Sequence, residues 1–349
     1  MYPILFHCDA STEIGFGHVY RCLAVAQALR WEHGISTALA MADGPPGFAA
    51  VRESGFTLFA WNRQSFADRE SWLQRVVEEE GVKALVFDLR EGLNPDFFQI
   101  LRRRGCLLVS IDDLTGNRLF MDIVFNPPVF DQDEMSWEGF QGKRFSGWEW
   151  VVLREQFLFP ENKKENRPPR ILVTMGGSDP AGLTEMAVTA LCLAGGGFQA
   201  DIVLGPGFQR QEEIQRLLGQ ACFLHQIHNH VAEMAGVMAI ADLAVASFGM
   251  TAYELAAMGV PAIYLCLSPI HQRRAQGFAL HGMARNLGLY TQVVLEDLAL
   301  EIHKLLIDKG KRQDMSQAAC QKDLRHGARR VADRIVKAIR ETRNSSLSV

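Results

Sequence analysis

The chain has no pair of cysteines at metal-ligand spacing. Its seven cysteines, at positions 8, 22, 106, 192, 222, 266 and 320, are scattered, and none forms a C-x-x-C pair. Zinc and thioredoxin-type chemistry are therefore unsupported. Buried, reduced thiols in a cytoplasmic protein are the expectation.

Long apolar runs and an excess of positive charge are also missing. No apolar stretch reaches the ~18 residues of a membrane span, and Asp9 interrupts the N-terminal apolar segment too early for a signal peptide. The formal charge of −4 argues against a nucleic-acid ligand, which normally meets a basic face. We therefore expect a cytoplasmic protein with no membrane span and no nucleic-acid partner. Because no interaction element is obvious, we expect a monomer.

What the chain does have is a long alternation of strand-like and helix-like segments. With 349 residues, of which 48% are apolar and 22% charged, it suits two globular domains. Continuous apolar strands between amphipathic helices predict α/β domains with parallel sheets covered on both faces. Strands are expected at 4–6, 35–41, 84–87, 107–111, 170–174, 201–204, 242–246 and 262–266, and helices at 18–31, 69–80, 96–104 and 251–258.

Segment 160–169 divides this pattern in two. Apart from its prolines it has no apolar side chain to bury, which is typical of an interdomain linker. The sequence thus predicts two Rossmann-like domains, over 1–159 and 170–349, that face a cleft. The charged segment 313–343 is expected to be a terminal helix that braces the lobes by packing back on the N-terminal one.

The loop Gly15-Phe16-Gly17-His18, before the first long helix, is the most informative motif. Glycines allow a sharp turn and close approach of a ligand, and the free amides of a first helical turn attract anions. It is not the dinucleotide fingerprint, because Tyr20 stands where the third glycine would be. A histidine here is often only a cap. At a strand end facing a cleft, we expect His18 to be a neutral general base, worth typically ~10²–10⁴ in rate.

Two further glycine turns precede helices in the second half of the chain. Asp179 or Ser178 could simply cap the first of these helices, and Thr251 the second. Glu254 lies one turn into the second helix, where a carboxylate can accept both hydroxyls of a ribose while amides behind it hold a diphosphate. Alone, Glu254 would be expected to face solvent. Together, the two turns favour a nucleoside diphosphate site; they are Gly176-Gly177-Ser178-Asp179 and Gly249-Met250-Thr251.

Acidic residues and histidines elsewhere do not suggest a metal. Adjacent residues at a strand end point to opposite sides, so Asp112-Asp113 is expected to be loop structure rather than a chelate. Asp88, alone at its strand end, is left open as a ligand of sugar hydroxyls. His225, His228 and His230 lack partners at ligand spacing and are expected in a loop near the nucleotide.

Asp9-Ala10-Ser11 with Gly15-x-Gly17-His18-x-x-Arg21-Cys22-Leu23 resembles the N-terminus of the nucleotide-sugar hydrolases of pseudaminic acid biosynthesis. Those enzymes remove UDP from UDP-2,4-diacetamido-2,4,6-trideoxy-β-L-altropyranose. The resemblance implies a two-lobed glycosyltransferase-B fold, also seen in related spore-coat polysaccharide proteins. It continues at Ile111-Asp112-Asp113, Leu153-Arg154-x-x-Phe157, Gly176-Gly177-Ser178-Asp179-Pro180, Ala241-Asp242-Leu243, Gly249-x-Thr251-x-x-Glu254, Gly259-x-Pro261 and Gly327-Ala328-x-Arg330-Val331.

Carried over to this chain, the resemblance makes His18 the base that activates water at the anomeric carbon, with inversion and without a metal or cofactor. The residues it implies for UDP are Gly176, Gly177, Ser178, Gly249, Met250, Thr251 and Glu254. Those it places near the sugar or its phosphate are Asp9, Gly15, Gly17, Arg21, Asp88, His271 and Gln272.

Three positions depart from the family pattern. The family commonly has Asp-x-Tyr at Asp88-Leu89-Arg90, Asn-Gln at His271-Gln272, and arginine at His7. All three are expected near the sugar or its phosphate, so a different UDP- or CMP-linked sugar stays open. So does transfer to a sugar acceptor, as in a glycosyltransferase. A non-catalytic nucleotide-sugar binding protein is the third alternative.

Overall fold

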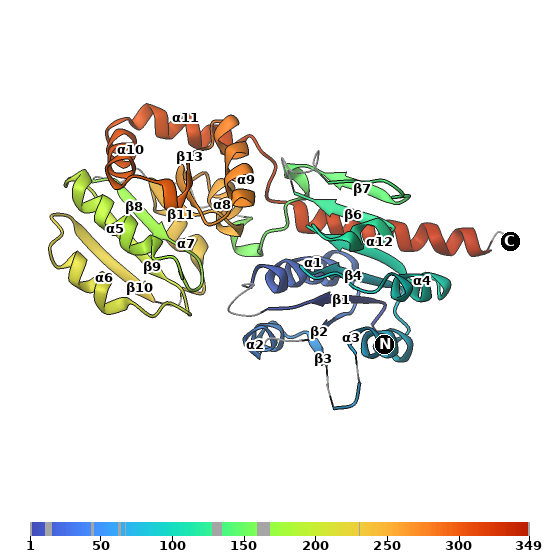
Figure 1. The fold of residues 1–349 in the computed structure, drawn as a ribbon. Coiled ribbons are helices and arrows are strands. Elements are labelled where there is room, and N and C mark those ends of the chain that lie inside the picture. The colour runs from blue at the N-terminus through green and yellow to red at the C-terminus, as the bar shows by residue number, and fades with distance from the viewer. Residues whose placement is uncertain are drawn as a thin grey trace. The chain divides into compact units, whose positions relative to one another are not determined.

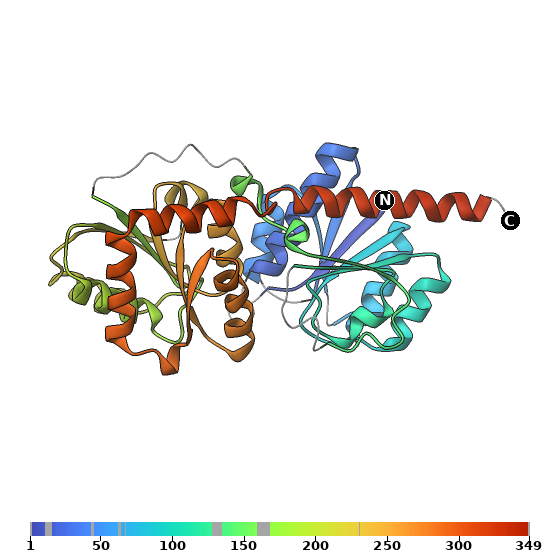
Figure 2. The same cartoon turned by 90° about the horizontal axis from the view of Figure 1, so that it is seen from above.

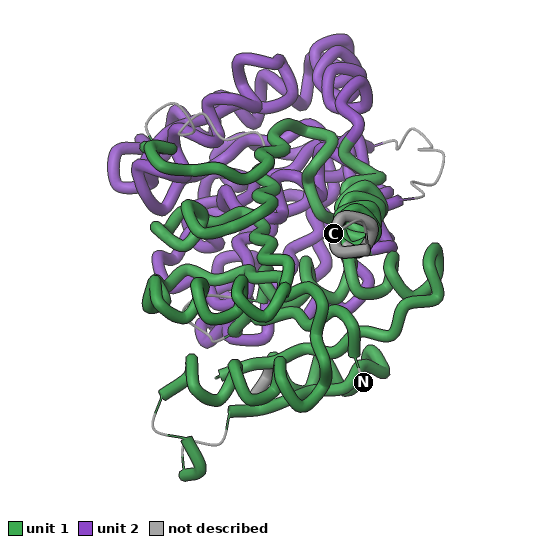
Figure 3. Tube along the Cα trace, turned by 90° about the vertical axis from the view of Figure 1, so that its right-hand side faces the viewer, with its two compact units in different colours: residues 1–128, 132–154, 324–349 green, residues 129–131, 155–323 purple. Residues whose placement is uncertain are grey.

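The computed structural model describes residues 2–10, 16–42, 45–61, 64–66, 68–127, 135–158, 168–229 and 231–347. The chain divides into two compact units (Figure 3). Unit 1 comprises residues 1–128, 132–154 and 324–349, and unit 2 comprises residues 129–131 and 155–323. Most of the expected linker at 160–169 lies outside the described residues. None of the described helices is both long and apolar enough to cross a membrane.

Unit 1 is built on a parallel sheet whose described strands run in the order β3-β2-β1-β4-β5-β6-β7 (Figure 1). The strands are β1 (Ile4–Cys8), β2 (Thr37–Met41), β3 (Thr57–Ala60), β4 (Ala84–Asp88), β5 (Leu107–Ile111), β6 (Ile123–Asn126) and β7 (Lys143–Ser146). The helices are α1 (Gly17–His33), α2 (Pro45–Glu53), α3 (Arg69–Glu80), α4 (Pro95–Arg103) and α12 (Gly327–Leu347), with short 3-10 helices at Gly116–Phe120 and Trp148–Trp150.

Alternate residues of the central strands enter different cores. Phe6 of β1 and Val86 of β4 pack in the core that contains α1 and α12, whereas Leu5 and Phe87 pack in the core that contains α3 and α4. Side chains two residues apart on a strand share a face. Asp88, two residues after Val86, is therefore directed to the α1 side of the sheet.

Unit 2 has a second sheet (Figure 2). Its described strands are parallel and run in the order β10-β9-β8-β11-β12-β13. The strands are β8 (Arg170–Thr174), β9 (Gln199–Leu204), β10 (Leu224–Asn229), β11 (Leu243–Ser247), β12 (Ala262–Cys266) and β13 (Ala284–Leu289). The helices are α5 (Leu183–Ala194), α6 (Gln211–Leu218), α7 (Met234–Ala239), α8 (Met250–Ala257), α9 (Pro269–Leu280), α10 (Leu295–Ile307) and α11 (Lys309–Cys320), with 3-10 turns at Glu155–Phe157 and Tyr290–Gln292.

The unit 2 sheet is also covered on both faces. Ile263 of β12 packs in the core with residues of α5, α6 and α10. The next residue, Tyr264, points the other way and lies against Phe278 of α9, with ring centroids 5.7 Å apart. Continuous apolar strands of this kind are what two covered faces require.

The C-terminal segment differs from the single helix expected over 313–343. It forms two helices: α11 belongs to unit 2 and α12 to unit 1. The chain approaches Val151 so closely at Gly327 that a Cβ there would overlap the Val151 backbone, so glycine is required where α12 begins. Val331, Ala332 and Ile335 of α12 then pack in the core beside α1.

Each sheet has one point where the strand order reverses. In unit 1 it lies between β1 and β4, where Cys8 is in register with Asp88. In unit 2 it lies between β8 and β11, where Thr174 is in register with Ala246. Open α/β sheets bind ligands at the carboxyl ends of strands beside such a point. Both switch points therefore mark candidate sites.

Candidate active site

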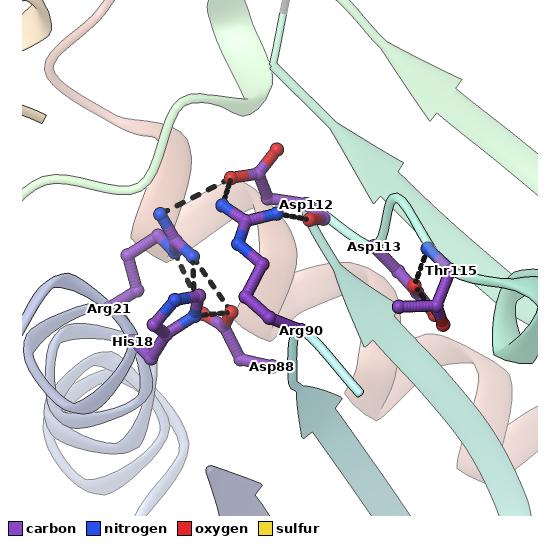
Figure 4. Close-up of polar contacts among 7 residues, drawn as sticks. All are labelled: His18, Arg21, Asp88, Arg90, Asp112, Asp113 and Thr115. Atoms are coloured by element: carbon purple, nitrogen blue, oxygen red, sulfur yellow. Dashed lines mark hydrogen bonds and ion pairs between the residues drawn. The ribbon is translucent and has the colours of Figure 1, made fainter. Parts of the chain in front are cut away.

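The unit 1 switch point brings His18 and Asp88 together (Figure 4). Asp88 ends β4 on the face that α1 covers, and its Oδ1 lies 2.6 Å from Nδ1 of His18. The side chains are 7% exposed for His18 and 0% for Asp88. Nη2 of Arg21, which only donates, also lies 3.0 Å from this Nδ1, but the carboxylate, which only accepts, is closer at 2.6 Å. The neutral imidazole of this pair therefore carries its proton on Nδ1 and keeps the Nε2 lone pair. An oriented imidazole of this kind is suited to general-base work.

Arg21 holds Asp88 from the next turn of α1. Its Nε donates to Oδ2 of Asp88 at 2.7 Å, and its Nη2 donates to Oδ1 at 2.7 Å. Residues three apart share a helix face, so Arg21 reaches the carboxylate from the same side as His18. A forked pair of this kind fixes the carboxylate in position as well as in charge.

Asp112 and Arg90 extend these contacts toward the surface. Nη1 of Arg21 lies 3.3 Å from Oδ2 of Asp112. Arg90 donates to the same Oδ2 at 2.9 Å and to the backbone oxygen of Asp112 at 2.9 Å. Figure 4 shows the five side chains as one connected network, with Asp113 directed away from it toward Thr115.

The charges in this network stabilise one another. Burial alone raises the pKa of Asp88, but Arg21 and His18 outweigh it and hold the pKa below the ordinary value of an aspartate. Burial likewise lowers the pKa of Arg21, yet Asp88 and Asp112 raise it above that of a free guanidinium. Both groups are therefore ionised at neutral pH.

Three residues expected near the sugar or its phosphate have buried partners in unit 1. The side chains of Arg21 and Asp88 are bonded to each other and hold His18. Their contact with the sugar stays a prediction. His7 is fully buried: its Nδ1 lies 2.8 Å from the backbone oxygen of Ala40, and its ring packs edge-on against Trp72. Strand alternation sends it to the α3 face with Leu5, so the expected position near the sugar is wrong.

The remaining unit 1 residues shape the loops around His18. Oδ1 of Asp9 accepts the amide of Ala42 at 2.8 Å, and Oδ2 lies 3.2 Å from Arg69, so Asp9 joins the ends of β1 and β2. Gly17 is the first residue of α1. Gly15 lies outside the described residues.

Both Asp112 and Asp113 were expected to be loop structure, but Asp112 is instead paired with Arg21 and Arg90. Oδ1 of Asp113 accepts the amide of Thr115 at 2.7 Å and its hydroxyl at 2.8 Å, which confirms a loop role. Burial is the main cause that raises the pKa of Asp113 to about 6. Within the described residues, no group of three or more histidine, cysteine or acidic side chains is placed to hold a metal.

In unit 2, the two glycine turns lie side by side at the switch point. Gly176 follows β8 with φ of 83°, and a Cβ on it would lie 3.9 Å from Oγ of Ser247, the last residue of β11. Gly176 and Gly177 are both exposed, and Ser178 is half-buried. The backbone of this turn is thus open to a ligand.

The helices after these turns differ in what they can offer an anion. Asp179 caps α5: its two carboxylate oxygens accept the amides of Leu183 and Thr184, each at 2.8 Å. Two of the amides expected to be free on α5 are thus already satisfied, and capping is the better description of Asp179. Among the described residues no side chain caps α8, whose N-cap is Gly249 and whose first turn has no acidic residue. The N-terminus of α8 is therefore the better candidate of the two to bind an anion.

The other predicted unit 2 residues follow the same sheet edge. Met250 and Thr251 begin α8 half-buried. Glu254 is only 8% exposed, so a solvent-facing role does not apply. His271 and Gln272 lie in the first turn of α9, after β12 and so next to β11; the amide of His271 donates to Oγ of Ser268 at 3.2 Å.

His225 and His228 lie elsewhere. They belong to β10, the outermost described strand on its side of the sheet, and β9 separates that strand from β8. Nε2 of His228 pairs with Oδ1 of Asp201 at 2.7 Å. The expectation of a loop is therefore wrong for both, because they belong to a strand; His230 lies outside the described residues.

Three curated proteins are similar in sequence. The uncharacterized protein MJ1062 of Methanocaldococcus jannaschii is 27% identical over 274 residues, 74% of this chain and 54% of its own length. The spore coat polysaccharide biosynthesis protein SpsG of Bacillus subtilis is 23% identical over 305 residues, 85% of this chain and 87% of its own. The UDP-2,4-diacetamido-2,4,6-trideoxy-β-L-altropyranose hydrolase of Campylobacter jejuni is 25% identical over 182 residues, which are 50% of this chain and 61% of the hydrolase.

The chain is a distant relative of this hydrolase and of SpsG. It spans about half the length of MJ1062 and 61% of the hydrolase. No protein-family model matches the chain.

Solved structures identify the fold. MurG of Acinetobacter baumannii superposes with a TM-score of 0.72 at 18% identity, covering 96% of this chain and 99% of MurG. HepE of Anabaena, solved in complex with UDP, superposes with a TM-score of 0.67 at 14% identity, covering 97% of this chain and 100% of HepE. The fold is therefore of the glycosyltransferase-B type, as expected.

Proposed function

We propose that this chain is a hydrolase that cleaves a UDP-linked amino sugar into free sugar and UDP. The observation that carries the proposal is the His18–Asp88 pair, with Nδ1 and Oδ1 2.6 Å apart at the switch point of unit 1. Its distant relative in Campylobacter jejuni is such a hydrolase by name. MurG-like folds support a nucleotide-sugar site without fixing the reaction.

In the proposed reaction His18 activates water. Nε2 takes a proton from the water as its oxygen bonds to the anomeric carbon, and the bond between that carbon and the diphosphate oxygen breaks. UDP leaves with the bonding electrons. A single displacement from the face opposite UDP inverts the anomeric centre. Asp88 stabilises the imidazolium that forms, and Arg21 keeps Asp88 in place.

The proposed UDP site is in unit 2. The exposed Gly176-Gly177 backbone and the start of α8, with Gly249, Met250 and Thr251, would hold the diphosphate. That positive field would also ease departure of UDP, so the mechanism as proposed uses no metal or cofactor. Glu254 would accept the ribose hydroxyls, and Ser178, His271 and Gln272 would lie near the phosphates or sugar.

The proposed substrate is UDP-2,4-diacetamido-2,4,6-trideoxy-β-L-altropyranose or a close analogue. The relative named for that substrate is the reason for this choice. Because Arg90 and His271 depart from the family pattern, close analogues of this sugar nucleotide are tested as substrates as well. We also propose that the protein acts as a monomer; a stable dimer in sedimentation would contradict this.

A glycosyltransferase is the second candidate, because MurG and a glycotransferase of kitacinnamycin share the fold. In that case His18 would deprotonate an acceptor hydroxyl. Assays of UDP release from a panel of UDP-amino sugars, with no acceptor present, separate the two candidates. The hydrolase predicts release with water alone. Release that requires a sugar acceptor would favour the transferase.

The His18→Ala variant tests whether the chain is an enzyme at all. Catalysis predicts a large loss of turnover with UDP affinity retained. A nucleotide-sugar binding protein predicts that every measured property survives the substitution. Calorimetric titration with UDP, run beside the release assay, provides both readouts.

A further inference from the structure

The charge network around His18 has one accessible member. His18, Arg21, Asp88 and Asp112 all have side chains at most 7% exposed, whereas the side chain of Arg90 is 33% exposed. Arg90 is also the last cation of an alternating series that runs from it through Asp112, Arg21 and Asp88 to His18. A change at Arg90 is therefore transmitted inward along buried ion pairs.

Arg90 holds Asp112 by two different groups. One guanidinium nitrogen donates to the carboxylate of Asp112 and the other to its backbone oxygen. Asp112 has φ of 51°, a left-handed conformation that is uncommon for a residue other than glycine, and its amide donates to the oxygen of Phe125 at 2.8 Å. Arg90 thus fixes both the charge and the backbone of the residue that Arg21 contacts.

The network is balanced in charge when His18 is neutral. Arg21 and Arg90 carry positive charges, and Asp88 and Asp112 carry negative ones. Among the described residues, the thiols of Cys8 and Cys22 also lie close to the network; their pKa values are raised, so they are neutral. Asp9 acts on Cys8 electrostatically, but its carboxylate is engaged by Arg69 and by the amide of Ala42. The carboxylate of Asp113 is directed away, toward Thr115 (Figure 4). Removal of the Arg90 charge leaves one net negative charge behind His18.

We propose that Arg90 is a positioning residue whose charge, acting through Asp112 and Arg21, disfavours protonation of His18. It does so by occupying Asp112, which leaves Arg21 engaged with Asp88. Without Arg90, the carboxylate of Asp112 competes for Arg21, and the uncompensated negative charge favours the imidazolium. The effect on turnover rests on the proposed function, but the effect on the His18 proton does not.

The test is an NMR titration of the His18 ring in the full chain, with His18→Ala assigning the signal. In Arg90→Met the titration midpoint should rise by about 0.5–1 pH unit. Arg90→Lys, which keeps the charge, should stay near the wild-type midpoint. Arg75→Met removes an exposed arginine that pairs with Glu79 on α3, and should change nothing. A folded Arg90→Met protein with an unchanged midpoint would overturn the proposal.

Asp112→Asn provides a second variant of opposite sign. It removes a negative charge, so the midpoint should fall below that of the wild type. A rise in this variant, or movement of both variants in the same direction, would contradict the electrostatic role. Circular dichroism establishes that each variant is folded before its titration is read.

Kinetics distinguish this role from contact with the sugar. If His18 is the base, the acid limb of the kcat profile in Arg90→Met moves to higher pH with KM little changed. A raised KM with the His18 midpoint unchanged would instead make Arg90 a substrate ligand and overturn the proposal. If the wild-type chain releases no UDP, the proposed function fails while the titration still decides the role of Arg90.

Discussion

Asp88 reaches from the end of β4 to His18 at the start of α1, and their Oδ1 and Nδ1 atoms are 2.6 Å apart. The pair forms because strand alternation directs Asp88 to the face that α1 covers. Arg21 then fixes Asp88 through two donors of one guanidinium. A carboxylate that would be costly to bury alone becomes the orienting partner of a histidine.

Asp88→Asn should abolish most of the activity without loss of UDP affinity. An amide can present its NH₂ group to Nδ1, which selects the wrong tautomer and removes the stabilisation of the imidazolium. We expect turnover to fall by about 10²–10⁴-fold. Steady-state kinetics of UDP release measure it. The exposed Asp96→Asn on α4 is the control, and equal turnover in both variants would contradict the orienting role.

Arg21→Met should destabilise the protein strongly. It leaves Asp88 and Asp112 buried without the cation that both contact, and removing one partner of a buried pair typically costs about 3–5 kcal/mol. Urea denaturation measures the free energy of unfolding. Arg75→Met, at a pair more than half exposed, should cost far less, because solvent screens an exposed ion pair. A loss of similar size in both variants would show that the buried network contributes little.

Asp113→Asn should stabilise the protein at pH 8 but not at pH 4. The pKa of Asp113 in the folded chain is about 6, above the ~3.9 of an unfolded aspartate, so its ionisation opposes folding. That penalty grows from pH 4 to 6 and is complete above pH 6. An asparagine retains the oxygen that accepts from Thr115 without ionising. The gain at pH 8 should be about 1–3 kcal/mol, measured by urea denaturation at both pH values.

A gain of equal size at pH 4 and pH 8 would show that ionisation of Asp113 is not its cause. The difference between wild type and variant isolates this residue, because every other titrating group is common to both proteins.

Gly176→Ala should weaken UDP binding by about tenfold or more, equivalent to ~1.4 kcal/mol. A side chain at this exposed turn strains a φ of 83° and adds a methyl group where the diphosphate is proposed to approach. Gly195→Ala at the end of α5, with φ of 95° and nothing near its Cβ, carries similar strain away from the turn. Calorimetry with UDP should show loss only in Gly176→Ala; equal affinities would move the nucleotide elsewhere.

Strong local patterns were enough to predict much of the fold. The strands at 107–111 and 262–266 and the helix at 69–80 have the predicted bounds, because apolar runs and helical spacing specify them locally. The split between α11 and α12 was missed. Charged residues continue through 321–326, and the close approach at Gly327 depends on Val151, which is distant in sequence.

The site was only partly predictable for the same reason. Glycine turns marked both switch points, but the partner of His18 depends on the register that sets Cys8 opposite Asp88. Whether a backbone amide is free to bind a ligand also depends on nearby side chains. Asp179, for example, accepts hydrogen bonds from two amides at the start of α5. The burial of His7 could have been predicted from the alternation of side chains along β1, because His7 lies on the same face of the strand as Leu5. Sequence alone marked Arg90 only as a departure from the family pattern, because its contact with Asp112 joins two different strand ends.

Hydrolysis in ¹⁸O-labelled water tests the central claim most directly. The substrate is UDP-2,4-diacetamido-2,4,6-trideoxy-β-L-altropyranose, with wild type and His18→Ala compared at neutral pH by mass spectrometry and NMR. We predict that the label enters the anomeric hydroxyl of the sugar, that UDP is unlabelled, that the first anomer formed is inverted, and that His18→Ala gives little product. Label in the UDP phosphate, or equal turnover in His18→Ala, would contradict water activation by His18 at the anomeric carbon.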